Sequence, residues 1–308
     1  MEGFTHDGEF VLVAEDGAND LKNYPVKCVN GRIWVNNHAH VLQGKAGIAD
    51  NSFLAFAISQ SDIESLLVGG GRAKLNAETL MSIEFRLPCL QEQYRIGEYL
   101  TQLDHLITLH QRKFEKLTNV KKSMLEKMFP KNGSSYPEIR FKGFTDPWEQ
   151  RKCKDVAPLQ RGFDLPTSQM VEGKFPVVMS NGVGGYHNEY KVKGPGVITG
   201  RSGTIGKLQY IESDYWPHNT ALWVTNFKDN YPKFIFYLYQ NLDLSKFGTG
   251  SGVPTLNRND VHDTLVCVPD FDEQKKISAY FDCLDNLITL HQRKSFLMKW
   301  RISGVDRN

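Results

Sequence analysis

A stretch of eleven residues near the middle of the chain recurs almost unchanged near its end. Residues 103–113 read LDHLITLHQRK and residues 284–294 read LDNLITLHQRK, so the copies differ only at His105 and Asn286. The offset, 284 − 103 = 181 residues, is far longer than the period of about 20–50 residues that is typical of solenoid repeats. The chain is therefore predicted to contain a duplicated module, with each copy followed by the same helix.

The same offset of 181 residues joins matching residues upstream of this stretch. The matching pairs are Phe53 and Phe234, Leu75-Asn76 and Leu256-Asn257, Pro88 and Pro269, Glu92-Gln93 and Glu273-Gln274, and Ile96 and Ile277. Before residue 34 the two copies no longer align by eye. The duplication thus covers much more than one helix.

Apolar residues in both copies are spaced alternately by four and three residues, and this pattern is typical of a coiled coil. The members of the seam are Ile96, Leu100, Leu103 and Ile107 in the first copy and Ile277, Phe281, Leu284 and Ile288 in the second. The first helix is predicted to run from about residue 91 to residue 129, where Pro130 ends it. We expect these two sets to face each other in an antiparallel pair. The alternative is that each helix is an amphipathic core helix of one domain.

The 308 residues have room for two domains of ordinary size. The formal net charge of +2 gives no sign of a nucleic-acid partner. The five cysteines show no paired spacing, which is typical of reduced thiols in a cytoplasmic protein. No apolar run reaches the roughly 18 residues of a membrane span, and the first residues do not resemble a signal peptide. A cytoplasmic protein is therefore predicted.

Local patterns predict an α+β fold in which each module mixes short strands with helices. In the first module we expect strands at 9–14, 31–35, 38–42 and 80–87, and a helix from Asp50 to about residue 67. A linker rich in Pro, Gly, Ser and Lys follows at 131–150. In the second module we expect strands at 177–179, 196–199, 208–211, 221–224 and 264–268, and a helix that begins at Pro232.

The sequence contains no recognisable catalytic motif. It has no phosphate-binding G-x-x-x-x-G-K-[ST] loop, no G-x-S-x-G elbow and no glycine-rich S-adenosylmethionine loop. Cys28, His38 and His40 could be imagined as zinc ligands, but they lack a partner cysteine. Asp270, Glu273 and Lys275 are similar to a nuclease cluster, although acidic residues at a helix start explain them better. No catalytic residue and no metal site is predicted.

Polar, glycine-rich loops are the better candidates for a binding site. Arg, Lys, Asn, Ser and Thr side chains hold phosphates and read base edges in protein–DNA complexes, whereas ordinary turn chemistry explains the glycines equally well. The candidate DNA-binding residues are Arg161, Ser180, Asn181, Arg201, Ser202, Thr204, Lys207, His218, Asn219, Asn257 and Arg258 in the second module and Arg72, Lys74 and Asn76 in the first.

The ordered set of motifs resembles the specificity subunit of Type I restriction-modification enzymes. In both copies it runs Leu-Asn, a strand, Leu-Pro or Val-Pro, Glu-Gln, Ile, and then the repeated LD-x-LITLHQRK. Residues 137–145 and 148–152 also look like that family's entry into its second reading domain. The resemblance covers nearly the whole chain.

The resemblance implies two target recognition domains that each grip half of a split DNA site, held apart by an antiparallel pair of conserved helices. The implied segments are a partial first target recognition domain (1–87), a first spacer helix (88–131), a linker (132–149), a second target recognition domain (150–268) and a second, shorter spacer helix (269–303). The helices would dock two methyltransferase subunits, and the complex would recruit the restriction subunit for phage defence. S-adenosylmethionine, ATP and Mg²⁺ would belong to those partners, and this chain would bind no cofactor.

Two departures from the family pattern concern the ends of the chain. Residues 148–181, which open the second module, have no counterpart at the offset of 181, so the first domain is expected to lack its beginning. Residues 295–300 replace the seam residues of the first helix, so the second helix is expected to be shorter.

The main interpretation is a non-catalytic DNA specificity subunit. The alternatives are a helical scaffold that does not bind DNA, an inactive fragment of such a subunit, and a nuclease in its own right.

Overall fold

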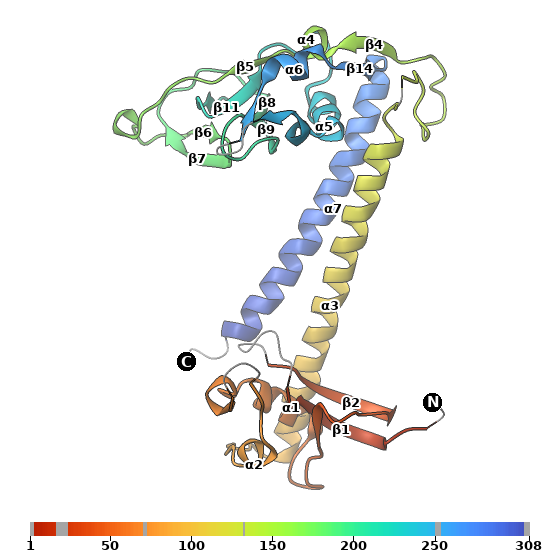
Figure 1. Ribbon diagram of the computed structural model, residues 1–308, viewed down its shortest axis with the longest axis vertical. Coiled ribbons are helices and arrows are strands. Elements are labelled where there is room, and N and C mark those ends of the chain that lie inside the picture. The colour runs from red at the N-terminus through yellow and green to blue at the C-terminus, as the bar shows by residue number, and fades with distance from the viewer. Residues whose placement is uncertain (1–2, 17–23, 70–72, 132, 250–253, 305–308) are drawn as a thin grey trace. The chain divides into compact units, whose positions relative to one another are not determined.

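The computed structural model describes residues 3–16, 24–69, 73–131, 133–249 and 254–304. The chain divides into two compact units (Figure 1). Unit 1 comprises residues 1–112 and 292–308, and unit 2 comprises residues 113–291. The two long helices, α3 (Leu90–Lys127) and α7 (Phe271–Gly304), contribute residues to both units. No helix within the described ranges is long and apolar enough to cross a membrane.

Unit 1 contains an antiparallel sheet with the strand order β2-β1-β3. Its elements are β1 (His6–Ala14), β2 (Val26–Ile33), β3 (Ala39–Leu42), α1 (Asn51–Ser59), the 3-10 turn η1 (Glu64–Leu66) and α2 (Ala77–Met81). Helix α1 contacts β1 and β2 (Figure 1). Asp50 caps α1 as predicted, because its carboxylate accepts a hydrogen bond from Phe53 N at 2.8 Å. The core gathers apolar side chains of these elements, among them Val11, Val13, Ala55, Ile58 and Leu75.

Unit 2 contains a four-stranded antiparallel sheet with the order β5-β11-β8-β9. Its strands are β5 (Leu159–Arg161), β8 (Gly196–Gly200), β9 (Leu208–Ile211) and β11 (Ala221–Val224). Helix α5 (Pro232–Leu242) contacts β8 and β9 (Figure 1). Pro232 is its first residue, as predicted. The aromatic side chains of Phe234, Tyr237 and Tyr239 are buried in the largest core cluster of the described chain.

Smaller elements complete unit 2. Strand β6 (Phe175–Met179) lies between β10 (Trp216–Pro217) and β7 (Gly182–His187), β4 (Glu149–Lys152) pairs with β14 (Leu265–Val268), and β12 (Gly248–Thr249) pairs with β13 (Thr255–Leu256). The remaining short helical turns are α4 (Cys153–Val156), η2 (Thr167–Gln169), η3 (Leu244–Phe247) and α6 (Arg258–Asp263). The strands predicted at 177–179, 196–199, 208–211, 221–224 and 264–268 are confirmed to within a residue or two.

The two units share one plan, as the repeat predicts. Helices α1 and α5 begin at residues 51 and 232, and α3 and α7 begin at residues 90 and 271, so both pairs keep the offset of 181. The sheet order β2-β1-β3 matches β9-β8-β11. In unit 1, Leu12 of β1 pairs with Lys27 of β2, and in unit 2, Thr199 of β8 pairs with Leu208 of β9. From β2 to β9 the offset is 208 − 27 = 181 residues, but from β1 to β8 it is 199 − 12 = 187 residues. The connection between the paired residues is therefore six residues longer in unit 1 than in unit 2.

A buried glutamine fastens each long helix to its module in the same way. In unit 1, Gln93 Nε2 donates to Pro88 O at 2.9 Å, and Gln93 Oε1 accepts from Asp50 N at 3.0 Å. In unit 2, Gln274 Nε2 donates to Pro269 O at 3.0 Å, and its Oε1 accepts from Tyr231 N at 2.8 Å. Asp50 and Tyr231 each precede the first residue of the equivalent helices α1 and α5. One side chain therefore holds the start of two helices together in both copies.

The apolar face predicted for each long helix is correct. The buried or half-buried residues of this face are Ile96, Leu100, Leu103 and Ile107 in α3 and Ile277, Phe281, Leu284 and Ile288 in α7. Within unit 2 the two helix segments run antiparallel, because Lys121 contacts Asp285 while Phe129 contacts Phe281. Lys121, which interrupts the apolar spacing, places its ammonium 2.5 Å from the Asp285 carboxylate.

The residue pairing predicted across this seam is wrong. Within unit 2, Ile277, Phe281 and Leu284 share one core cluster with Leu125, Met128 and Phe129. The reason is geometric: antiparallel pairing reverses the order of one helix, so the first turns of α7 lie beside the last turns of α3. Equivalent positions of two identical seams face each other all along their length only in a parallel pair.

Two predictions for unit 1 are also wrong. The helix expected to continue to residue 67 ends at Ser59 and is followed only by η1. The strand expected at 80–87 is absent, because residues 77–81 form α2 and residues 83–89 have no regular structure. Their counterpart in unit 2 is β14, which hydrogen-bonds with β4. The described residues of unit 1 offer no such partner strand, and a strand without a partner leaves its backbone groups unpaired.

Gly97 allows a close contact between α3 and α1 that its place in the sequence does not predict. A Cβ atom at Gly97 would lie 2.9 Å from Phe53 N and 2.9 Å from Asp50 Oδ1, closer than side-chain carbons approach such atoms. Only glycine therefore allows α3 to contact the start of α1 this closely. In unit 2 the equivalent position is Ser278, a buried residue whose hydroxyl donates to Gln274 O at 2.7 Å.

Two leucines of α7 provide a test of the seam. Leu284 is 8% exposed and lies in the core cluster, whereas Leu287, one turn later, is 38% exposed. Leu284→Ala is expected to lower the free energy of unfolding by about 2–5 kcal/mol because it leaves a cavity. Leu287→Ala is expected to change it by no more than about 0.5 kcal/mol. Urea denaturation followed by tryptophan fluorescence measures both, and equal losses would contradict the packing.

Candidate nucleic-acid interface

Three arginines from distant parts of the sequence line one groove of unit 2. Arg161 ends β5, Arg201 follows β8, and Arg258 is the first residue of α6. The groove has a volume of about 420 Å³, and Thr255, Leu256, Asn257, Asn259 and Leu222 also line it. Four of the predicted candidates, Arg161, Arg201, Asn257 and Arg258, are therefore brought together here. The structure thus places three guanidinium groups and two side-chain amides on the surface of this groove.

Backbone hydrogen bonds hold the Arg201 loop rigidly against its neighbours. Arg201 N donates to Thr220 O at 2.8 Å, and Leu256 N donates to Arg201 O at 2.7 Å. Ser202 forms an isolated β-bridge with Thr255. Gly200 must be glycine, because a Cβ atom there would lie 1.7 Å from Thr204 O. The guanidinium group of Arg201 is thus presented from a fixed backbone, and fixed donors lose little conformational entropy when they bind.

The three guanidinium groups differ in their surroundings. Arg161 Nη2 donates to Asp164 Oδ1 at 2.9 Å, and Asn219 Nδ2 donates to the same oxygen. Arg201 and Arg258 form no ion pair within the described residues. Asn257 is partly engaged, since its Oδ1 caps α6 by accepting from Asn259 N at 3.0 Å. Arg201 and Arg258 are therefore the donors most available to an anionic or base-edge ligand.

Other candidates of the second module make hydrogen bonds within and between the loops. Lys207 Nζ donates to the backbone oxygen of Asn181 at 2.6 Å. Ser180 N donates to Thr220 Oγ1 at 3.3 Å, and His218 Nδ1 lies 3.0 Å from the same hydroxyl. Thr204 is exposed but does not line the groove. These contacts fix the loops that surround β6 and β8.

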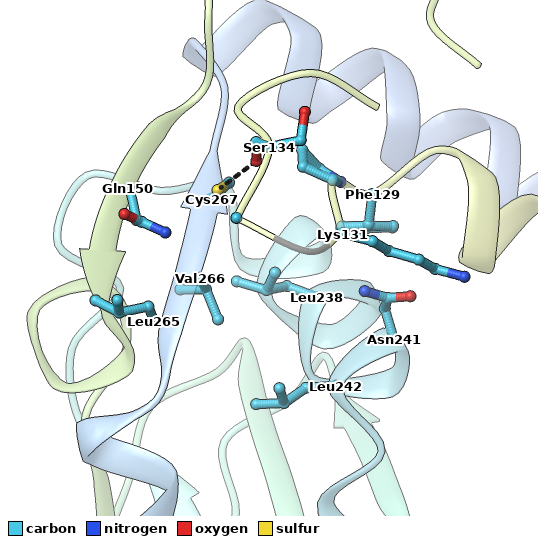
Figure 2. A pocket seen from close by; sticks show the side chains of 12 residues that line it. Phe129, Lys131, Ser134, Gln150, Leu238, Asn241, Leu242, Leu265, Val266 and Cys267 are labelled. Carbon is cyan, nitrogen blue, oxygen red and sulfur yellow. Dashed lines mark hydrogen bonds between the residues drawn. The ribbon is translucent and has the colours of Figure 1, made fainter. Parts of the chain in front are cut away.

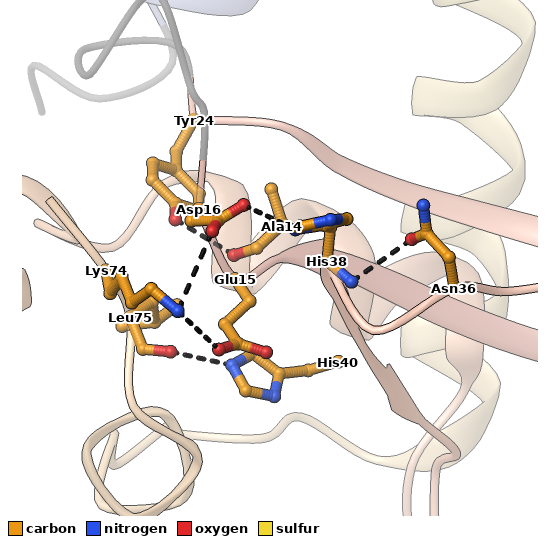
Figure 3. Close-up of polar contacts among 9 residues, drawn as sticks. All are labelled: Ala14, Glu15, Asp16, Tyr24, Asn36, His38, His40, Lys74 and Leu75. Carbon is orange, nitrogen blue, oxygen red and sulfur yellow. Dashed lines mark hydrogen bonds and ion pairs between the residues drawn. The ribbon is translucent and has the colours of Figure 1, made fainter. Parts of the chain in front are cut away.

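The candidates of the first module have a different environment. Arg72 lies outside the described residues. Lys74 Nζ is 3.4 Å from Glu15 Oε1 and 3.7 Å from Asp16 Oδ2 (Figure 3). Asn76 is exposed and precedes α2 without a side-chain cap hydrogen bond. The single described cation of this set is thus already paired with two carboxylates.

The equivalent loops of the two units carry opposite charge. In unit 1, Leu75 N donates to Glu15 O at 2.8 Å, just as Leu256 N donates to Arg201 O in unit 2. Asp16 forms an isolated β-bridge with Lys74 in unit 1, and Ser202 forms one with Thr255 at the equivalent place in unit 2. The backbone position of Arg201 is therefore occupied by a glutamate in unit 1. At this place the described residues of unit 1 are therefore acidic, whereas the groove of unit 2 is basic.

The two histidines considered as zinc ligands are engaged elsewhere. His38 Nδ1 lies 2.9 Å from Asp16 Oδ1, and His40 Nε2 lies 2.7 Å from Leu75 O (Figure 3). Cys28 contacts Glu9 and Ser52 instead of either histidine. No group of three potential metal ligands occurs in the parts of the chain that the structure describes.

The acidic cluster at the start of α7 is structural. Asp270 Oδ1 accepts hydrogen bonds from Asp272 N and Glu273 N, both at 3.0 Å, and so caps the helix. Glu273 is buried and receives two hydrogen bonds from Arg140, at 2.8 and 2.7 Å. Lys275 is exposed. The role of Arg140 could not be predicted from local sequence, because its partner lies 133 residues away.

The linker also lines a small pocket of about 150 Å³ (Figure 2). The side chains that line this pocket are mostly apolar. Cys267 Sγ donates to Ser134 O at 3.5 Å. Burial raises the pKa of the Cys267 thiol, so the thiolate needed for nucleophilic chemistry is disfavoured.

A family model for the Type I restriction modification DNA specificity domain matches residues 2–119 and 145–296. The chain therefore belongs to this family, and the resemblance noted in the sequence is confirmed.

Curated relatives agree with the family assignment. A putative type I restriction enzyme specificity subunit of Haemophilus influenzae is 29% identical over 93% of this chain and 77% of its own length. The specificity subunit of the type I restriction enzyme MjaVIII of Methanocaldococcus jannaschii is 24% identical over 82% of this chain and 68% of its own length.

Solved structures show the same fold. The S subunit of a type I restriction-modification system from M. genitalium matches 99% of this chain and 83% of its own, with a TM-score of 0.67 at 15% identity. A chain from a structure on complex assembly and conformational transition of the type I system matches 96% of this chain and 79% of its own, with a TM-score of 0.54 at 14% identity.

Two half-buried histidines, His218 and His262, are expected to make unit 2 less stable in acid. Leu159 N donates to His262 Nε2 at 2.8 Å, so this nitrogen must be unprotonated. Burial lowers the pKa of both His218 and His262 from the usual 6.5. The charge of Arg161 also lowers the pKa of His218, and the charge of Arg258 also lowers the pKa of His262. Below about pH 6.5 the unfolded chain therefore binds more protons than the folded one.

We expect the free energy of unfolding to fall as the pH drops below about 6.5 and to be insensitive to these two histidines above that pH. In His262→Gln the amide oxygen can still accept from Leu159 N but does not titrate, so the acid-induced loss should be smaller. Urea denaturation at a series of pH values measures it. His105→Gln, a change at an exposed histidine of α3, is the control. Parallel pH profiles for wild type and His262→Gln would contradict this account.

Proposed function

We propose that the chain reads DNA through the groove of unit 2, with Arg201 and Arg258 as the principal contacts to bases or phosphates. The observation that carries this proposal is the convergence of three arginines and two asparagines on one groove. Guanidinium forks pair with guanine edges and phosphates, and amides pair with adenine. Membership of the DNA specificity domain family supports the same conclusion.

The repeated helices are the proposed docking site for methyltransferase subunits. Leu106 and Leu109 of α3 and the equivalent Leu287 and Leu290 of α7 are each at least 38% exposed, although they lie within the repeated stretch. Exposed leucines at matching positions of two copies suit two copies of one partner. The restriction subunit would join through the complex, and the two domains would grip a split target.

The chemistry of methylation and cleavage is assigned to the partners. S-adenosylmethionine, ATP and Mg²⁺ would therefore bind to the methyltransferase and restriction subunits, and this chain would act in the cytoplasm as their guide to DNA.

Arg201→Ala tests the groove directly. The chain is expressed with its methyltransferase subunit, and the methylated motif is mapped by single-molecule sequencing of the host DNA. If Arg201 forks onto a base, Arg201→Ala should relax one position of one half-site and weaken DNA binding by about 1–3 kcal/mol. If it binds a phosphate, the motif should stay unchanged, while affinity and its salt dependence fall.

Arg151→Ala is the matched control, because Arg151 lies on β4, pairs with Glu149 and does not line the groove. It should leave the motif and the affinity unchanged. If Arg201→Ala also leaves both unchanged, the groove is not the reader. If the wild-type chain binds its methyltransferase subunits but the complex shows no salt-dependent DNA binding, the chain is a scaffold instead.

The isolated chain is expected to be inactive as an enzyme. Incubated with DNA, Mg²⁺, ATP and S-adenosylmethionine, it should neither cut nor methylate the DNA, because no cluster of its described residues can activate water or hold a methyl donor. Radiolabelled methyl transfer and plasmid nicking are the measurements. Activity in a preparation shown by mass spectrometry to lack partner subunits would contradict the assignment.

A further inference from the structure

The loop that follows β5 is held in place by the backbone of unit 2. Phe163 N donates a hydrogen bond to Pro217 O at 2.8 Å. Gly162 must be glycine, because a Cβ atom there would lie 2.2 Å from His218 O. The side chains at both ends of this short loop therefore project from a backbone of fixed position.

Two of these side chains form an ion pair at the groove. Arg161 lines the groove, and its Nη2 donates to Asp164 Oδ1 at 2.9 Å. The same carboxylate oxygen accepts a hydrogen bond from Asn219 Nδ2. Asn219 precedes Thr220, whose backbone oxygen accepts from Arg201 N at 2.8 Å. One carboxylate thus joins Arg161 to the segment that also holds the Arg201 loop.

The Arg161–Asp164 pair is open to solvent. The side chain of Arg161 is 48% exposed and that of Asp164 is 63% exposed. Exposed ion pairs contribute little to the stability of a fold, because water and salt screen their charges. The hydrogen bond from Asn219 holds the pKa of Asp164 below its usual range, so the carboxylate is ionised at neutral pH. The pair therefore affects the orientation of Arg161 more than it affects folding.

The negative charge of Asp164 also affects which ligand suits Arg161. A phosphate is repelled by a carboxylate held next to the arginine, and a pair without net charge gains little from displacing counterions. The edge of a guanine carries no full charge, and its O6 and N7 atoms accept two hydrogen bonds from one guanidinium group. Arg161 is therefore better suited to a base than to a phosphate.

Arg161 is restrained, unlike the other two arginines of the groove. Arg201 and Arg258 form no ion pair with another described residue and keep their full charge. A guanidinium group that is already oriented loses less conformational entropy when it binds, and its planar geometry favours a defined partner. The groove thus combines one oriented arginine with two arginines that are free to meet an anion.

We propose that Asp164 is a positioning residue that orients Arg161 towards a guanine, so that Arg161 determines one position of the DNA half-site. This inference rests on the proposed function, since it assigns a specificity role within the same groove. Nη2 of Arg161 keeps its contact with Asp164, while other N–H groups of the guanidinium donate to O6 and N7 of the base. Asn219 fixes the carboxylate in turn.

Mapping the methylated motif tests the proposal with the chain expressed beside its methyltransferase subunit. Arg161→Ala and Asp164→Ala should relax the same single guanine position, and the double variant should relax no further position. In competition binding of the complex to duplexes with each base at that position, the preference for guanine should fall about tenfold in either variant. The thermal unfolding midpoint of Asp164→Ala should stay that of the wild type.

Glu149→Ala is the matched control, because it removes the carboxylate of another exposed arginine pair, with Arg151 outside the groove. It should leave the motif unchanged. Tighter DNA binding by Asp164→Ala with an unchanged motif would mean that Arg161 binds a phosphate, and the proposal would be wrong. Relaxation of different positions by Arg161→Ala and Asp164→Ala would also overturn it, because Asp164 would then read a base itself.

Arg201→Ala separates this inference from the proposed function. If Arg201→Ala changes the motif or the affinity while Arg161→Ala and Asp164→Ala do not, the groove binds DNA and only the role of Asp164 is refuted. If none of the three variants changes the motif or the affinity, the groove is not the reader, and both the inference and the proposed function fail.

Discussion

The buried glutamine at the start of each long helix is the contact on which each unit depends. Gln93 and Gln274 each join the start of a long helix to the backbone before the short helix of the module. A buried amide makes a directional contact, because it needs donors and acceptors at fixed positions. Gln274 adds a bond from Nε2 to Asn230 Oδ1, and Gln93 adds one to Ile48 O. The angle between helix and module is therefore set by hydrogen bonds as well as by apolar packing.

The sequence predicted the features that depend on local spacing. The long helices, their apolar faces, the cap at Asp50 and the start of α5 at Pro232 follow from periodicity and capping chemistry. The partners of Ile277 and Phe281 could not be derived in the same way, because periodicity defines a face and not a neighbour. The strand expected at 80–87 has the right composition, but the described residues of unit 1 offer it no strand to pair with. The groove was only partly predictable, since Arg161, Arg201 and Arg258 are joined by the sheet and not by sequence proximity.

The two units share the same arrangement of elements but carry different side chains at equivalent loop positions. The same backbone position carries Glu15 in unit 1 and Arg201 in unit 2, and each is held by an equivalent hydrogen bond. The scaffold of helices keeps a constant offset, whereas the offset changes by six residues between β1 and β2. Loops at that end therefore vary in length and charge while the long helices keep their positions in the repeat. Such a division lets one part of a chain change its ligand without disturbing the other part's docking surface.

The exchange of Ser278 for Gly97 gives the two long helices unequal stiffness. Glycine has the lowest helix propensity after proline, because its backbone loses the most freedom when it is ordered. The first turns of α3 should therefore open locally more often than those of α7, in which Ser278 is buried and hydrogen-bonded. Amide hydrogens around Gly97 would then exchange with solvent faster than those around Ser278. A pair of nearly identical helices would thus fray first at the end that begins in unit 1.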